Sequence, residues 1–203
     1  MRHALVCALF PVLAALPGFA CVTAEDATTG VRFTLADGAE GTVQVSGQMV
    51  ALNYATNKGA KIDERQSRYG IYDVKRLRQD SELPVVGSGA DRLSWFYQTT
   101  PPRPEPGMVW HGTLRQELDQ VGYGTEMVEL HSRSQVSYGA TWTVLEGKEV
   151  TLSGCPYRVL PVEMTRDGET AVAGRWIWFA DLGFGIQTIR EGKSNGITGL
   201  TAP

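Results

Sequence analysis

His111 and His131 lie beyond the first 20 residues, and both are candidates for catalysis or metal binding. A metal site needs several imidazole, thiolate or carboxylate groups at converging spacings, such as i and i+2 on a strand. Only His131 has such a neighbour, Glu129, and that pair supplies a fragment of a ligand set. We therefore predict no metal site and expect both histidines at the surface.

Cys155 lies in the stretch Gly154-Cys-Pro-Tyr-Arg158, whose first residues match the start of a dithiol redox site. Such a site needs a second cysteine and a helix N-terminus, where free amide groups stabilise the thiolate and lower its pKa. Here Arg158 stands where the second cysteine would be, and an alternating strand pattern follows. We therefore expect Cys155 to be a disulfide partner or a cysteine at the start of a strand.

Other catalytic signatures are absent from the sequence. No serine lies in a Gly-x-Ser-x-Gly elbow, and no glycine-rich phosphate-binding loop occurs. Tyr54 and Lys58 have the spacing of a dehydrogenase pair, but no phosphate-binding turn precedes them. We predict no catalytic residues and no cofactor. A hydrolase that uses a serine, His131 and an acid is the least favoured function.

Tryptophan is the residue type that best marks a possible binding surface. The tryptophans all lie in segments with strand patterns: Trp95, Trp110, Trp142, Trp176 and Trp178. Core packing is the simpler interpretation, since one tryptophan buries a large apolar area. The alternative is that some of them line a hollow that accepts a lipid chain or another apolar ligand. For that role we select Trp95, Trp110, Trp176 and Trp178.

Residues 1–20 are typical of a secretory signal peptide, with a basic start, an apolar run and small residues before Cys21. Ala20-Cys21 also resembles part of the acylation site of bacterial lipoproteins. Cys21 is therefore lipidated, bonded to Cys155, or removed by cleavage after Ala24. We predict a periplasmic or otherwise exported protein, attached to a membrane only if Cys21 is lipidated. The formal net charge of -3, without a basic cluster, argues against nucleic acid as a partner.

Strand patterns dominate the rest of the chain. The clearest run covers residues 148–192, where apolar and polar side chains alternate and Asp167-Gly168 marks a hairpin turn. Within it Trp176 and Trp178 share one strand face. No window of about eleven or more residues keeps the 3.6-residue spacing of apolar side chains that marks a helix. We predict a single all-β domain over residues 21–203, a curved antiparallel sheet or incomplete β-barrel with little helix; a β-sandwich is the alternative.

Four segments depart from the strand pattern. Residues 25–30 are expected to be a polar, unstructured lead-in, and residues 61–68 a solvated charged connection. Residues 100–107 hold four prolines, which remove backbone donors, so we expect a surface loop there. Residues 115–120 are compatible with a turn or two of helix.

The C-terminal third resembles a known family. The turn from Gly154 to Tyr157, the Asp167-Gly168 turn, and Trp176-Ile-Trp-Phe followed by Asp181-Leu-Gly183 are similar to segments of the DUF3108-type envelope proteins. That family is similar in shape to the half-barrels of the lipoprotein carriers LolA and LolB. The resemblance implies an envelope protein with a cupped sheet, and it implies no catalytic residues.

Together these observations predict a non-catalytic exported envelope protein that binds a lipid-like or other apolar ligand in the concavity of its sheet. The alternative is a structural or assembly protein that presents a sheet edge or face to another envelope protein. A co-purified protein without a bound small molecule would favour that alternative.

Overall fold

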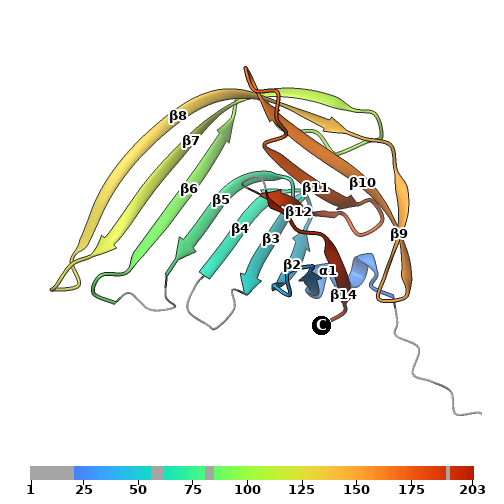
Figure 1. The fold of residues 1–203 in the computed structure, drawn as a ribbon, viewed down its shortest axis with the longest axis horizontal. Coiled ribbons are helices and arrows are strands. Elements are labelled where there is room, and N and C mark those ends of the chain that lie inside the picture. Colours follow the sequence, from blue (N-terminus) through green and yellow to red (C-terminus); the bar gives the residue numbers. More distant parts are fainter. Residues whose placement is uncertain (1–20, 56–61, 81–84, 191–192) are drawn as a thin grey trace, which may run out of the picture.

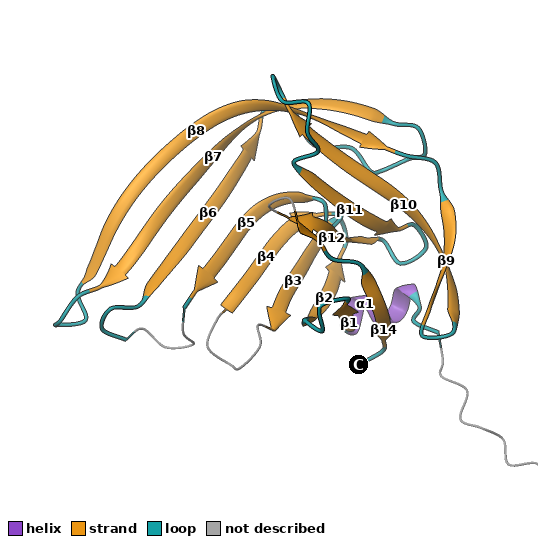
Figure 2. Cartoon of the chain, in the orientation of Figure 1, coloured by secondary structure: helices purple, strands orange, loops and turns teal. Residues whose placement is uncertain are grey.

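The computed structural model describes residues 21–55, 62–80, 85–190 and 193–203. Strands make up most of the described chain, and they form one antiparallel sheet (Figure 2). The strands are β1 (Val31–Leu35), β2 (Glu40–Ser46), β3 (Met49–Ala55), β4 (Ile62–Arg68), β5 (Tyr72–Gln79), β6 (Gly89–Tyr97), β7 (Val109–Tyr123), β8 (Glu129–Val144), β9 (Lys148–Leu152), β10 (Cys155–Arg166), β11 (Gly174–Phe179), β12 (Phe184–Arg190), β13 (Lys193–Ser194) and β14 (Ile197–Thr201).

The sheet curls into an incomplete barrel (Figure 1). Neighbouring strands follow the order β13-β12-β11-β10-β8-β7-β6-β5-β4-β3-β2-β1-β14, and β9 pairs with β10. The terminal strands of this order, β13 and β14, do not pair with each other in the described chain, which leaves one seam open. The prediction of an all-β curved sheet or incomplete barrel is confirmed.

The longest strands, β7 and β8, form a hairpin whose register runs unbroken from Val109 opposite Thr143 to Tyr123 opposite Glu129. With β5 and β6 they make the arched wall on the left of Figure 1. The expectation of a helical turn at residues 115–120 is wrong. These residues pair with β6 on one side and β8 on the other, and the two ladders outweigh the local helix propensity.

Strand β11 and the middle of β10 are covered on both faces, because the sheet rolls inward at this end (Figure 1). Val159 and Phe179 belong to a core shared with β1, β2, β3 and the N-terminal segment, which we call the first core. Val162 and Trp178 belong to the aromatic core, shared with β5, β7 and β8. Strands covered on both faces need successive apolar side chains, as residues 176–179 provide.

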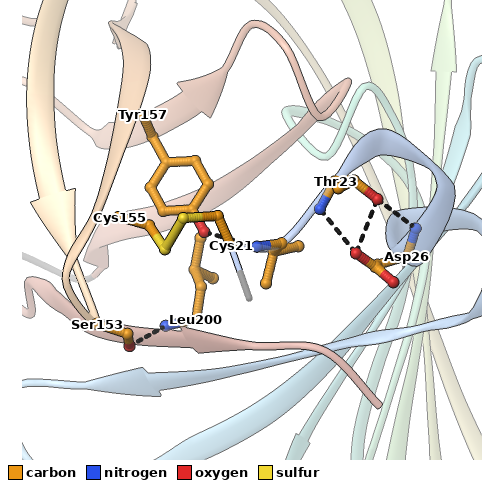
Figure 3. The surroundings of a disulfide bond; sticks show 8 residues. Cys21, Thr23, Asp26, Ser153, Cys155, Tyr157 and Leu200 are labelled. Atoms are coloured by element: carbon orange, nitrogen blue, oxygen red, sulfur yellow. Dashed lines mark hydrogen bonds between the residues drawn. A yellow bond between two sulfur atoms is a disulfide. The ribbon is translucent and has the colours of Figure 1, made fainter. Parts of the chain in front are cut away.

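A short helix, α1 (Ala24–Thr29), occupies residues expected to be unstructured, so that expectation is wrong. The Asp26 amide donates to Thr23 Oγ1 at 3.3 Å, and the Thr23 amide donates to Asp26 Oδ2 at 2.8 Å (Figure 3). This reciprocal cap satisfies amide groups at the helix start. The hydrogen bonds from the Thr23 amide and hydroxyl also lower the pKa of the Asp26 carboxyl. Ala27 is 0% exposed, and its burial in the first core holds a helix too short to be stable alone.

The turn between β4 and β5 is fastened to β12. The Gly185 amide donates to the Tyr69 carbonyl at 2.8 Å. Gly70 has a φ of 73°, and a Cβ atom there would lie 2.3 Å from the Gly185 carbonyl oxygen. The left-handed φ and the close approach both exclude a larger residue at this position.

A disulfide joins Cys21 to Cys155 of β10 across 134 residues (Figure 3). Beside it, the Val22 amide donates to the Tyr157 hydroxyl at 3.0 Å. Cys155 is 4% exposed and packs in the first core. A sulfur atom in a disulfide cannot also carry a lipid thioether, so this bond and lipidation of Cys21 are alternatives.

Residues 100–107 form an irregular loop, as the prolines predict. Pro101 and Pro104 are buried, and the Arg103 guanidinium lies over the Trp178 ring at 5.5 Å. The loop therefore covers one end of the aromatic core.

The disulfide should stabilise the fold by about 2–5 kcal/mol, mainly because it restricts the unfolded chain. Replacing both cysteines (Cys21→Ser with Cys155→Ser) should lower the free energy of unfolding in urea by that amount. Reductant should reproduce the loss in the wild-type protein and leave the double variant unchanged. An intact mass that shows two free thiols, or acyl chains on Cys21, contradicts the bond.

Candidate functional site

The concave side of β5–β8 collects aromatic side chains on one surface, which we call the inner wall. Because side chains alternate along a strand, the register between strands decides which of them share this face. Trp110 lies opposite Trp142 on β7 and β8. Trp95 lies opposite Gln116, which in turn lies opposite Val136.

The deep end of the inner wall is an aromatic floor made of Tyr72, Tyr97, Trp110 and Trp142. The ring centroids of Trp110 and Trp142 lie 4.9 Å apart, and the Tyr72 ring lies 5.3 Å from the first and 5.5 Å from the second. The Tyr72 contacts are edge-on, a geometry that the ring quadrupoles favour. This floor is a packed part of the aromatic core.

All four tryptophans selected from the sequence belong to the aromatic core. Trp95 and Trp110 are partly buried on the inner wall, whereas Trp176 and Trp178 lie across the core on β11 and are 4% and 3% exposed. Most of the surface of the β11 pair is therefore used in packing, and ligand contact by the four side chains stays a prediction. Trp142, which the sequence did not distinguish from an ordinary core residue, lies at the centre of the floor.

A buried ionic network lies on β4 and β5, on the same side of the sheet. Arg76 forms two hydrogen bonds with Asp63, from Nε to Oδ1 at 2.8 Å and from Nη2 to Oδ2 at 3.0 Å. Arg65 lies 3.6 Å from Asp63 and 3.9 Å from Asp73, and it donates to Gln187 Oε1 of β12 at 2.7 Å. The expectation of a solvated connection at residues 61–68 is wrong for 62–68, because these residues form β4 and its inward charges pair across strands.

Arg65 remains charged inside the barrel. Burial alone lowers the pKa of its guanidinium, because a low-dielectric environment disfavours the charged form. The carboxylates of Asp73 and Asp63, and the Tyr54 phenolate that forms in alkali, act in the opposite direction and raise the pKa overall. The guanidinium also lies over the Tyr54 ring at 5.1 Å.

Beyond the floor, the inner wall changes from apolar to polar along the strands. The next side chains outward combine aliphatic groups, Leu93, Leu118 and Val136, with the polar groups of Gln116 and Ser134. The rim carries polar groups that line a shallow pocket of about 460 Å³: Arg78, Asp91, Gln120 and Ser132. Gln120 Nε2 donates to Asp91 Oδ1 at 3.2 Å. A face graded in this way can hold a molecule with one apolar and one polar end.

The two histidines lie at the surface beside acidic groups. His131 Nδ1 lies 2.9 Å from Asp119 Oδ1, and its Nε2 lies 3.3 Å from Glu129 Oε2. The hydrogen bond with His131 lowers the pKa of the Asp119 carboxyl. His111 Nδ1 lies 3.7 Å from Asp167 Oδ1. Among the described residues, no group of three or more metal-ligating side chains could hold an ion.

Comparison of the chain with protein families, with curated proteins and with solved structures found no match. Within the described ranges, no helix is long and apolar enough to cross a membrane. The fold and the site together define a curled antiparallel β-sheet whose concave wall changes from aromatic to polar along the strands.

Buried tyrosines should make the protein sensitive to alkali. Burial raises the pKa of the hydroxyls of Tyr72, Tyr97 and Tyr138 above the ordinary value for tyrosine. In the unfolded chain the pKa of a tyrosine hydroxyl is about 10. Below that pH these hydroxyls do not reduce the free energy of unfolding, which then falls as the pH rises from about 10 toward their higher pKa values in the folded protein. Ultraviolet titration should show the ionisation of Tyr72, Tyr97 and Tyr138 delayed to strongly alkaline pH, together with alkaline unfolding.

The Tyr72→Phe variant provides the control, because the Tyr72 hydroxyl is buried without a hydrogen-bond partner among the described residues. It should remove one late ionisation and change the free energy of unfolding at neutral pH by no more than about 1 kcal/mol. A wild-type titration in which all tyrosines ionise together before the protein unfolds would contradict the buried floor.

The ionic network should be needed for folding stability. Arg65→Met should cost about 3–5 kcal/mol, because it removes a cation from carboxylates that stay largely buried. Arg68→Met is the matched control on β4, since Arg68 makes an exposed hydrogen bond to Gln48 at 2.9 Å. That variant should cost less than about 1 kcal/mol in the same urea titration. If the two variants lose the same free energy of unfolding, the buried ionic network stabilises the fold no more than an exposed hydrogen bond does.

Proposed function

We propose that this protein is a non-catalytic binding protein of the cell envelope that holds an amphipathic, lipid-like molecule against its inner wall. The observation that carries the proposal is the graded composition of that wall. Its aromatic and aliphatic stretch fits a hydrocarbon chain, and its polar rim fits a head group. Of the four tryptophans selected from the sequence, Trp95 and Trp110 lie at the apolar end of this wall.

Exposed apolar side chains on the inner wall support this proposal. Val136 is 52% exposed and Leu130 is 63% exposed, and both lie on the concave face of β8. Single exposed apolar residues need no explanation, but Val136 continues the buried aromatic surface on the same face, whereas Leu130 lies at the tip of the hairpin, beyond Ser134 and Ser132. On the convex face Phe96 is also exposed, but the Arg115 guanidinium lies over its ring at 4.6 Å.

The rim supports a ligand with a polar head group, since Asp80 and Asp91 line the same pocket as Arg78. Arg78 places an exposed cation there, and Gln120 and Ser132 offer hydrogen-bonding groups. The predicted export signal and the resemblance to envelope proteins favour a periplasmic location, where membrane lipids and lipoproteins supply such molecules. Binding in a preformed concavity requires no reacting group, in keeping with a carrier or sensor role.

Binding can be measured with a fluorescent long-chain fatty acid as the probe. Val136→Glu should weaken its affinity by about tenfold or more, because an ionised carboxylate then faces the apolar chain. Gln135→Glu is the matched control: it adds the same charge to the next residue of β8, on the opposite face. It should leave the dissociation constant within about twofold.

Native mass spectrometry followed by organic extraction tests the same proposal without a chosen probe. Protein purified without detergent should release a lipid-like molecule. Probe binding that both variants weaken equally would move the site away from the inner wall. A protein that neither takes up the probe nor releases a lipid would overturn the proposed function as a whole.

A further inference from the structure

The outer edge of β8 is open over most of its length. On one side β8 pairs with β7 from Glu129 to Thr143. On the other side it pairs with β10 only from Ala140 to Val144. Because the Asp167 amide also donates to the Gly139 carbonyl at 3.0 Å, the edge that no strand covers in the described part of the chain runs from residue 129 to residue 138. This edge is independent of the ligand proposal, which concerns a face of the sheet.

The hydrogen-bond pattern shows which backbone groups point outward along this edge. The Gly124 amide donates to the Val128 carbonyl, and the Val144 amide donates to the Met108 carbonyl, at 3.0 and 2.8 Å. Bonded pairs alternate in an antiparallel ladder, so the even-numbered residues of β8 bond to β7. The amide and carbonyl groups of His131, Arg133, Gln135 and Ser137 therefore point to the open edge.

Near the other ends of the sheet, β14 and β12 are each held by a hydrogen bond to another part of the chain. The Leu200 amide of β14 donates to Ser153 Oγ at 3.3 Å, and the Gly185 amide of β12 donates to the Tyr69 carbonyl at 2.8 Å. Natural edges are usually protected by proline, lysine or inward-pointing charges. Residues 129–138 contain no proline or lysine, and their concave-face side chains are uncharged: Leu130, Ser132, Ser134, Val136 and Tyr138.

We propose that this edge pairs with the same edge of a second copy of the chain, antiparallel and about a two-fold axis. Charge complementarity favours that occupant. On the convex face Glu129 and Arg133 have opposite charges and flank His131. Antiparallel pairing centred on His131 sets Glu129 opposite Arg133 of the partner subunit, and the reciprocal pair forms by symmetry.

The same pairing covers apolar surface at the tip of the hairpin. Val128 is 55% exposed and Leu130 is 63% exposed. Both lie within the overlapping segment, so their side chains gain neighbours from the second β8. Strand addition satisfies the open amide and carbonyl groups at the same time. The two inner walls then become parts of one continuous sheet.

Sedimentation equilibrium of protein purified from cells that express the full 203-residue sequence tests the proposal. The wild-type protein should be a dimer at concentrations of about 100 μM. Arg133→Pro should weaken dimerisation by about ten- to hundredfold, because it removes an outward amide in each copy and places a ring at the junction. Arg133→Ala loses the same charge but keeps the amide, so it should remain clearly more dimeric than the proline variant.

Both variants should fold, because the Arg133 amide does not bond to β7 and proline at this position leaves the β7–β8 ladder intact. Circular dichroism checks that they do. A wild-type protein that is monomeric throughout this range overturns the proposal. It is also overturned if the proline and alanine variants dimerise equally well. Fatty-acid binding is measured separately on the monomeric proline variant. If that variant still binds the probe, the ligand-binding proposal holds whether or not the protein dimerises.

Discussion

Burial of both faces of β11 is the constraint on which the rest of the structure depends. Trp176 and Trp178 fill the aromatic core on one side, while Phe179 and Ile177 pack in the first core on the other. Each large side chain buried in this way contributes roughly 1.5–3 kcal/mol, so leaving either face in water would be costly. The sheet satisfies both faces by rolling inward until the arched wall and the N-terminal strands cover β11 from opposite sides.

The inward roll also explains why part of the wall stays uncovered. β10 meets β8 only between Val162 and Arg166, because its first half turns away to pair with β9. In the described part of the chain, the outer half of the β7–β8 hairpin therefore has no strand along its edge, and Leu130 and Val136 on its concave face are exposed. One geometric cause thus produces both the exposed apolar face and the open backbone edge.

Sequence reasoning found the strands whose inward side chains are apolar and failed where they are polar. In β4 the inward residues are Asp63, Arg65 and Ser67, so the period of two carries no hydrophobic signal. Helix α1 was missed because its capping pair, Thr23 and Asp26, lies beside the presumed cleavage site. For the site, alternation placed Trp176 and Trp178 on one face. It could not place Trp110 against Trp142, because the register between strands is set by the whole sheet.

The open edge of β8 and the concave face of the inner wall point in different directions. A strand bound to the edge therefore need not block a ligand bound to the face. A strand that adds to β8 bonds within the plane of the sheet, through the outward amide and carbonyl groups of His131 and Arg133. A ligand on the inner wall contacts side chains perpendicular to that plane, such as Val136 and Leu118. Lengthening the sheet at its edge would extend the wall without filling the concavity. The proposed dimer would therefore enlarge the proposed binding surface instead of closing it.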